Sequence, residues 1–197
     1  MELIRKIKKH EMLRRWAIGE VYVEYLSSIN EEIPQETLRL LNSGSPGLER
    51  KGIKRSLKGH HLSLVDCLPS NVSWYLAKME LNQPELNKLY TLPVPELAKI
   101  TNFTYRVPYA AKIVQNIPSL NTRVTGIIDA FKSDASQVQL SGITFLAKQV
   151  EGPYTIIEGN GRTIGLYNTL FLEKIKVIKG NHIEVVLGLS EEEIGYV

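Results

Sequence analysis

The residue types best suited to chemistry stand together in one short segment, Glu158-Gly159-Asn160-Gly161-Arg162. Glycines allow a left-handed backbone and a close approach to an anion. The planar guanidinium of arginine matches the oxygens of a phosphate group. A carboxylate beside a phosphate repels it, unless the carboxylate holds a magnesium ion or accepts a proton from an attacking hydroxyl. The segment therefore predicts a phosphate-binding turn in which Glu158 is a catalytic base or a magnesium ligand.

The flanking patterns predict that this turn joins a strand to a helix. Residues 154–157 read Tyr-Thr-Ile-Ile and favour a strand, whereas residues 163–172 favour a helix. The first N–H groups of a helix lack internal partners and carry partial positive charge, so a phosphate placed there satisfies them. The expected phosphate or nucleotide contacts are Gly159, Asn160, Gly161, Arg162 and Thr163.

The same residues also suit a tight strand-to-helix turn that binds no ligand. Glycines close tight turns, and Asn160 tolerates a left-handed backbone. Glu158 would lie near a helix N-terminus, where an acid is favoured without any ligand. Short glycine motifs recur in turns of this kind, so the residues alone leave both interpretations open.

The composition indicates a globular chain. Its 197 residues are 43% hydrophobic and 23% charged, which suits one domain, alone or with an appendage. No apolar run reaches the roughly 18 residues of a membrane span, and no secretory signal is visible. We therefore expect no membrane contact and a cytoplasmic location. The single cysteine, Cys67, excludes a disulfide framework and a multi-cysteine zinc site.

Positive charge is concentrated in the first third of the chain, although the formal net charge is only +3. Residues 50–61 read RKGIKRSLKGHH, with five Lys or Arg residues and no acid. Basic clusters attract nucleic acids. We expect Lys51, Lys54 and Arg55 to contact DNA or RNA; the alternative is a solvated basic loop.

Hydropathy patterns divide the chain into a helical, basic part, residues 1–69, and an α/β domain, residues 70–197. A helix is predicted from Leu3 to Ile29, and a short one follows Pro34. Arg123, at the start of a further predicted helix, is another candidate for the phosphate pocket. The other predicted elements are strands at 73–81, 89–94, 142–148, 154–157 and 182–189, and helices at 107–114, 122–132 and 163–172.

Residues 140–171, LSGITFLAKQVEGPYTIIEGNGRTIGLYNTLF, resemble the core of the ParB/sulfiredoxin-like superfamily. That core runs strand, hairpin, strand, phosphate-binding turn, helix. The resemblance implies a ParB/sulfiredoxin-like α/β domain with a helical N-terminal extension. It also implies a nucleoside triphosphate, ATP or CTP, and Mg²⁺ at the turn. Sulfiredoxins use a cysteine in the turn, where this chain has Asn160, so their chemistry is not expected.

The letters EGNGR also match the core of the Fic motif, whose enzymes transfer nucleotides to hydroxyl groups. In that family a catalytic histidine stands four residues before the acid, and a second arginine stands three residues after the first. This chain has Tyr154 and Gly165 at those positions. Loss of the base removes the Fic chemistry, so this resemblance is rejected.

Two functions remain open on the sequence. One is a nucleotide-dependent enzyme that performs phosphotransfer, NTP hydrolysis or nuclease chemistry. Branches of the ParB/sulfiredoxin-like superfamily use an acid near the turn as base, or couple nucleotide hydrolysis to DNA nicking, and Glu158 would suit either. The other is a non-catalytic module of a regulatory or anti-phage system, which senses a nucleotide or binds DNA.

Overall fold

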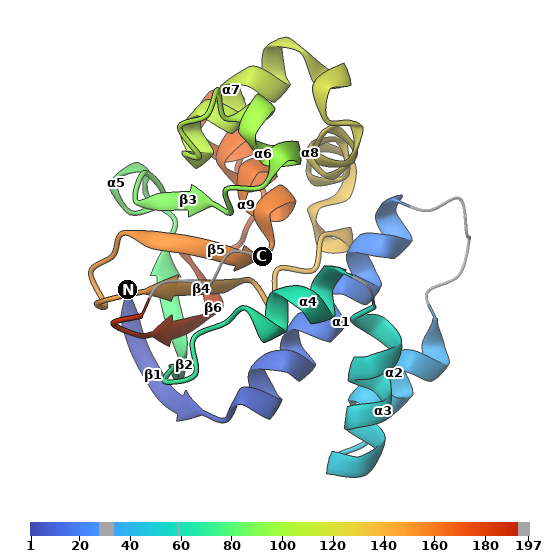
Figure 1. Ribbon diagram of the computed structural model, residues 1–197. Coiled ribbons are helices and arrows are strands. Elements are labelled where there is room, and N and C mark those ends of the chain that lie inside the picture. Colours follow the sequence, from blue (N-terminus) through green and yellow to red (C-terminus); the bar gives the residue numbers. More distant parts are fainter. Residues whose placement is uncertain (28–33, 59, 193–197) are drawn as a thin grey trace.

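A six-stranded mixed sheet forms the centre of the protein (Figure 1). The computed structural model describes residues 1–27, 34–58 and 60–192. The strand order is β1-β2-β6-β4-β5-β3, with β6/β4 and β5/β3 parallel and the other neighbours antiparallel. The strands are β1 (Glu2–Ile7), β2 (Ser73–Glu80), β3 (Leu89–Thr91), β4 (Thr144–Ala147), β5 (Tyr154–Glu158) and β6 (His182–Leu189). The prediction of a mixed α/β fold is confirmed.

One face of the sheet is covered by the helices of the N-terminal third, at the lower right of Figure 1. Their apolar side chains form a core with Trp74 and Leu76 of β2 and Leu146 of β4, and Trp16 lies fully buried in it. The helices are α1 (Lys9–Ser27), α2 (Gln35–Leu41), α3 (Pro46–Ser56) and α4 (His60–Asp66).

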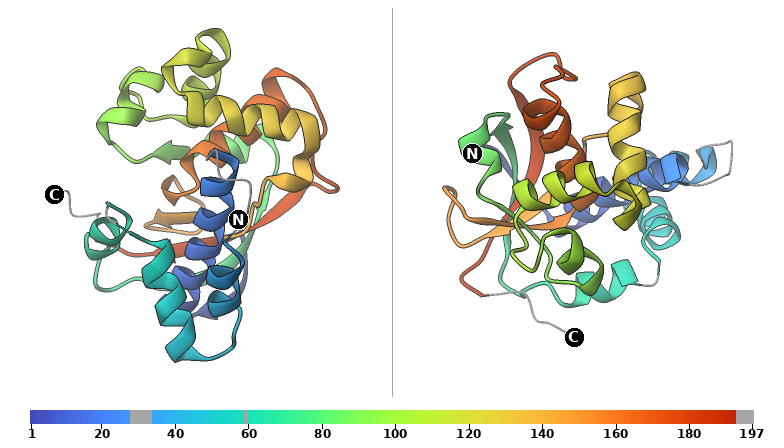
Figure 2. Two further views of the ribbon diagram at one scale, coloured as in Figure 1. Left: turned by 90° about the vertical axis from the view of Figure 1, so that its right-hand side faces the viewer. Right: turned by 90° about the horizontal axis from the view of Figure 1, so that it is seen from above.

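The opposite face carries the second group of helices, at the top of Figure 1 and seen from two further sides in Figure 2. Because side chains alternate along a strand, Phe145 and Ile156 enter this second core while their neighbours Leu146 and Ile157 enter the first. The helical elements are α5 (Gln83–Leu86), α6 (Pro95–Ile100), α7 (Val107–Asn116), η1 (Pro118–Leu120), α8 (Thr122–Asp134), η2 (Ala135–Gln137), α9 (Asn160–Tyr167) and the π-helical η3 (Asn168–Leu172).

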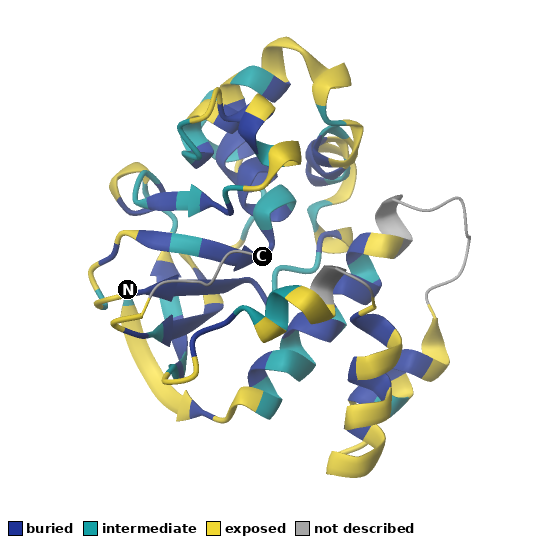
Figure 3. Cartoon of the chain, in the orientation of Figure 1, coloured by how far each residue is buried: buried dark blue, intermediate teal, exposed yellow. Residues whose placement is uncertain are grey.

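The helix predicted from Leu3 is wrong over its first residues. Residues Glu2–Ile7 form β1, an exposed edge strand that pairs with β2 (Figure 3). The backbone groups along the edge of β2 provide this pairing, and local helix propensity does not outweigh it. The helix begins at Lys9 instead, and the predicted end at Ile29 lies outside the described residues. The part predicted as helical, residues 1–69, thus contributes a strand to the common sheet.

The basic segment is not a loop, as the alternative interpretation had it, because residues Pro46–Ser56 form helix α3. Pro46 stands in the first turn, where its fixed φ favours a helix and its missing N–H has no cost. Gly52 and Ile53 lie on the buried side of α3. The basic residues therefore form the solvent face of a rigid element.

No helix among the described segments is both long enough and apolar enough to cross a membrane.

Candidate functional site

The predicted turn is a strand-to-helix junction, as expected. Strand β5 ends at Glu158, and α9 begins at Asn160. Between them Gly159 has φ of 92°, a left-handed conformation that favours glycine. Thr163 closes the corner from inside, because its backbone N–H and its Oγ1 both donate to the Gly159 carbonyl at 2.8 Å.

Arg162 points into the protein rather than toward solvent. Its side chain is only 1% exposed. Nη1 donates to the backbone carbonyls of Gln139 at 2.6 Å and Ser141 at 2.8 Å, and Nη2 donates to Glu158 Oε1 at 2.8 Å. A phosphate at the start of α9 would compete with these three acceptors for the guanidinium. The phosphate-binding role of Arg162 stays a prediction. Its structural role is to join the backbone of residues 139–141 to Glu158 through these hydrogen bonds.

The other predicted phosphate contacts are at least half-buried. Gly159 and Thr163 are buried, while Asn160 and Gly161 are half-buried. A Cβ on Gly161 would lie 3.0 Å from Ile127 Cδ1 of α8. Helix α8 therefore covers the start of α9 at Gly161.

Four charged side chains from separate elements meet behind the turn: Glu20 of α1, Arg123 of α8, Glu158 of β5 and Arg162 of α9. We call them the buried charge cluster. Glu158 shares a side-chain hydrogen bond with Glu20, and Arg123 Nη2 lies 3.5 Å from Glu20 Oε2. Glu20 and Glu158 are 2% and 7% exposed. The cluster joins helices from both sides of the sheet to its central part.

Burial, reinforced by the negative charge of Glu20, raises the pKa of Glu158 to about 8, and Arg162 only partly opposes this. Two carboxyl groups that share a hydrogen bond need a proton between them. The raised pKa therefore favours the protonated form of Glu158, with Glu20 as its partner. A protonated carboxyl donates a hydrogen bond and is not ready to act as a base.

Magnesium fits poorly beside Glu158. The Arg162 guanidinium already occupies one side of the carboxyl group, and a neighbouring metal cation would lie against that positive charge. No group of three or more His, Cys, Asp or Glu residues in the described segments is arranged to hold a metal ion. The predicted metal role of Glu158 gains no support from this arrangement.

Sequence reasoning placed Arg123 near the turn but missed Glu20. Arg123 reaches Glu158 only indirectly, through Glu20. No local pattern marks Glu20, which appears in the sequence as one acid of an amphipathic helix. Only the packing of α1 on the sheet identifies it as a buried residue.

The predicted nucleic-acid contacts lie on a separate surface, the outer face of α3. Lys51, Lys54 and Arg55 are all exposed. Arg55 Nη1 binds Glu36 at 2.7 Å, whereas Lys51 and Lys54 form no ion pair with any described residue. We call the exposed residues Arg50, Lys51, Lys54 and Arg55 the α3 cationic face.

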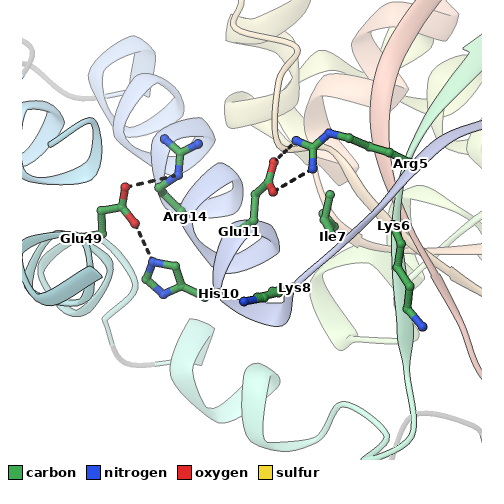
Figure 4. Close-up of a pocket in the computed structure, with 8 residues that line it drawn as sticks. All are labelled: Arg5, Lys6, Ile7, Lys8, His10, Glu11, Arg14 and Glu49. Carbon is green, nitrogen blue, oxygen red and sulfur yellow. Dashed lines mark hydrogen bonds and ion pairs between the residues drawn. The ribbon is translucent and has the colours of Figure 1, made fainter. Parts of the chain in front are cut away.

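A pocket of about 690 Å³ opens beside α3, where β1 passes into α1 (Figure 4). Its two acids, Glu11 and Glu49, are engaged in ion pairs with basic neighbours. We call it the corner pocket; its lining residues are Arg5, Lys6, Ile7, Lys8, His10, Glu11, Arg14 and Glu49. Sequence reasoning noted the basic N-terminal segment but not this concavity, because the fold of β1 against α1 creates it.

When the chain is compared with protein-family models, with curated proteins and with solved structures, none of them matches.

Proposed function

We propose that this protein is a non-catalytic module that binds nucleic acid through its N-terminal third. The observation that carries the proposal is the α3 cationic face. At 100° per residue its four cations span an arc of about 140° on one side of the helix. The buried residues Glu49, Gly52, Ile53 and Ser56 occupy the other side. A rigid row of exposed cations matches the repeated charge of a phosphate backbone.

The charge distribution along the chain supports the same surface. Residues 1–69 contain twelve Lys or Arg and nine Asp or Glu, whereas residues 70–197 contain twelve of each. The whole formal net charge of +3 therefore belongs to the part that carries α3. This asymmetry favours the approach of a polyanion to that side of the molecule.

Charge reversal on α3 tests the proposal. The double variant Lys51→Glu/Lys54→Glu should bind a fluorescein-labelled 20-base-pair duplex at least about tenfold more weakly than the wild type. The slope of log K against log salt should fall by about two, because each lost phosphate contact removes about one. Fluorescence anisotropy between low and physiological salt measures both quantities.

A matched control distinguishes binding through the α3 cationic face from general attraction due to net charge. Lys176 and Lys179 are also exposed and form no ion pair with a described residue. Lys176→Glu/Lys179→Glu changes the net charge by the same amount and should bind nearly as the wild type does. Equal losses in the two double variants, or no binding by the wild type at low salt, would overturn the proposal.

A second candidate is the nucleotide-dependent enzyme with its site at the β5–α9 turn. The observation that favours it is the raised pKa of Glu158, because strongly shifted carboxyl groups gather at catalytic sites. A ParB/sulfiredoxin-like assignment of residues 70–197 belongs to this candidate. The order β4, β5, turn and α9 supports that assignment, since it follows the strand, hairpin, strand, turn and helix of the superfamily core.

A further inference from the structure

We propose that the corner pocket binds a phosphate group, and that this phosphate anchors the nucleic acid before its backbone crosses the α3 cationic face. The inference rests on the proposed function and deepens it, because it gives one phosphate a defined position between β1, α1 and α3. Phosphate binding by the pocket can be measured with pyrophosphate, without any nucleic acid.

The ion pairs inside the pocket leave a positive excess. Glu11 lies between Arg5 and Arg15, and Glu49 lies between His10 and Arg14, with His10 Nε2 2.6 Å from its carboxylate. Each of the two carboxylates therefore already forms ion pairs with two basic side chains.

Lys6 and Lys8 also line the pocket, and neither forms an ion pair with a described residue. Both are exposed at the rim. Figure 4 shows the Lys6 side chain extending away from Lys8 and His10. A phosphate near His10 would therefore meet the Lys8 ammonium group, while the acids stay neutralised by their own partners.

The positions of Lys8 and His10 indicate where the phosphate binds. Figure 4 shows the Lys8 side chain extending toward the His10 ring. Glu49 holds His10 through Nε2, so the ring is fixed in orientation and Nδ1 is left on the other side. A phosphate between Lys8 Nζ and His10 Nδ1 would accept hydrogen bonds from both when Nδ1 carries a proton.

The pocket borders α3 at one residue of the cationic helix. Glu49 lines the pocket, and Arg50, the next residue of α3, is exposed on the cationic face. A volume of about 690 Å³ admits a phosphate together with part of its sugar. In this proposal the strand passes from the pocket, past Arg50, to the other cations of α3.

The test compares Lys8→Gln with Lys9→Gln. Lys9 is the adjacent residue; it is also exposed and carries the same charge, but it does not line the pocket. Pyrophosphate is titrated while NMR follows the ring protons of His10. The wild type and Lys9→Gln should show the same saturable shift, and Lys8→Gln should bind about tenfold more weakly. Melting temperatures establish that both variants are folded.

Oligonucleotides then identify the source of the phosphate. A single strand with a 5′-phosphate and the same strand with a 5′-hydroxyl are compared by anisotropy. A preference of the wild type for the 5′-phosphate that Lys8→Gln loses identifies a terminal phosphate. Equal weakening of both strands by Lys8→Gln identifies an internal phosphodiester. Either result supports the pocket.

The outcomes separate the pocket from the proposed function. Identical behaviour of Lys8→Gln and Lys9→Gln toward pyrophosphate and toward both strands overturns the phosphate pocket, even if the protein binds DNA. If Lys8→Gln alone loses pyrophosphate but the wild type binds no nucleic acid, the pocket stands as a phosphate site and the nucleic-acid function fails.

Discussion

The guanidinium of Arg162 lies directly against the backbone of Gly19 in α1. A Cβ at Gly19 would be 2.8 Å from Arg162 Nη2 and 3.0 Å from Nη1. Gly19 therefore leaves the space in which the buried arginine reaches Glu158 and two backbone carbonyls. The contact links helix α1 to the β5–α9 turn.

Gly19→Ala should lower the free energy of unfolding by about 1–3 kcal/mol, because the added methyl overpacks a filled site. Gly126→Ala is the matched control. Gly126 lies in α8, is exposed, and nothing would lie within 4 Å of an added Cβ. That control should gain about 0.5–1 kcal/mol from helix propensity. Urea unfolding measures both, and a Gly19→Ala variant as stable as Gly126→Ala would contradict the close contact.

Arg162→Ala should destabilise the fold by about 3–5 kcal/mol, because it leaves a buried carboxyl group and two backbone carbonyls without their donor. Arg123→Ala serves as comparison, since the Arg123 side chain is 50% exposed and makes the longer, 3.5 Å ion pair with Glu20. Its loss should cost much less. Equal effects of the two substitutions in urea unfolding would show that burial of Arg162 does not determine its contribution.

Stability should depend on pH through Glu158. Burial, with the charge of Glu20, raises the pKa of this carboxyl from 4.5 to about 8. The folded state holds the proton more tightly than the unfolded chain, so this contribution is fully present below about pH 4.5 and is lost as the pH rises through about 8. Within that window the free energy of unfolding should fall by up to about 1.4 kcal/mol per pH unit.

Glu158→Gln imitates the protonated carboxyl and should flatten this dependence. The control is Glu191→Gln, which neutralises an exposed acid and should retain the slope. Urea unfolding at pH 5 and pH 8 measures the difference for each protein. The shared proton is refuted if Glu158→Gln keeps the wild-type slope.

Nucleotide chemistry at the turn predicts a division of roles. Arg162→Ala should weaken ATP or CTP binding about tenfold or more. Glu158→Gln should keep binding but lose about 100-fold in turnover if Glu158 acts as base. Calorimetry with and without Mg²⁺, beside a hydrolysis assay, measures both properties.

Asn160→Ala keeps the buried charge cluster and removes a half-buried side chain at the start of α9. This variant therefore distinguishes weaker nucleotide binding from a loss of folding stability. If folded Arg162→Ala and Asn160→Ala both bind nucleotide as the wild type does, the turn is only a corner. Normal turnover by Glu158→Gln would exclude Glu158 as the base.

Local sequence was sufficient to predict the β5–α9 junction. The change from strand-like to helical patterning across residues 157–164 is a property of neighbouring residues, and the structure places the boundary at Gly159. The exposure of Lys51, Lys54 and Arg55 was equally predictable, because long charged side chains are costly to bury. Their helical arrangement was not recognised, since the buried side of α3 is recognisable only against α1 and α2.

The sequence by itself thus determined the mixed α/β class and most of the strands and helices after residue 70. It also identified the two groups of residues that could bind or react, at the turn and on α3. Only the tertiary structure decided what those residues contact. Strand β1 exists because the edge of β2 offers it hydrogen bonds. Glu20 meets Glu158, and Gly19 meets Arg162, because α1 packs across the sheet. Local periodicity specifies which side of an element is apolar, but the partner of a buried charge depends on contacts between residues far apart in the chain.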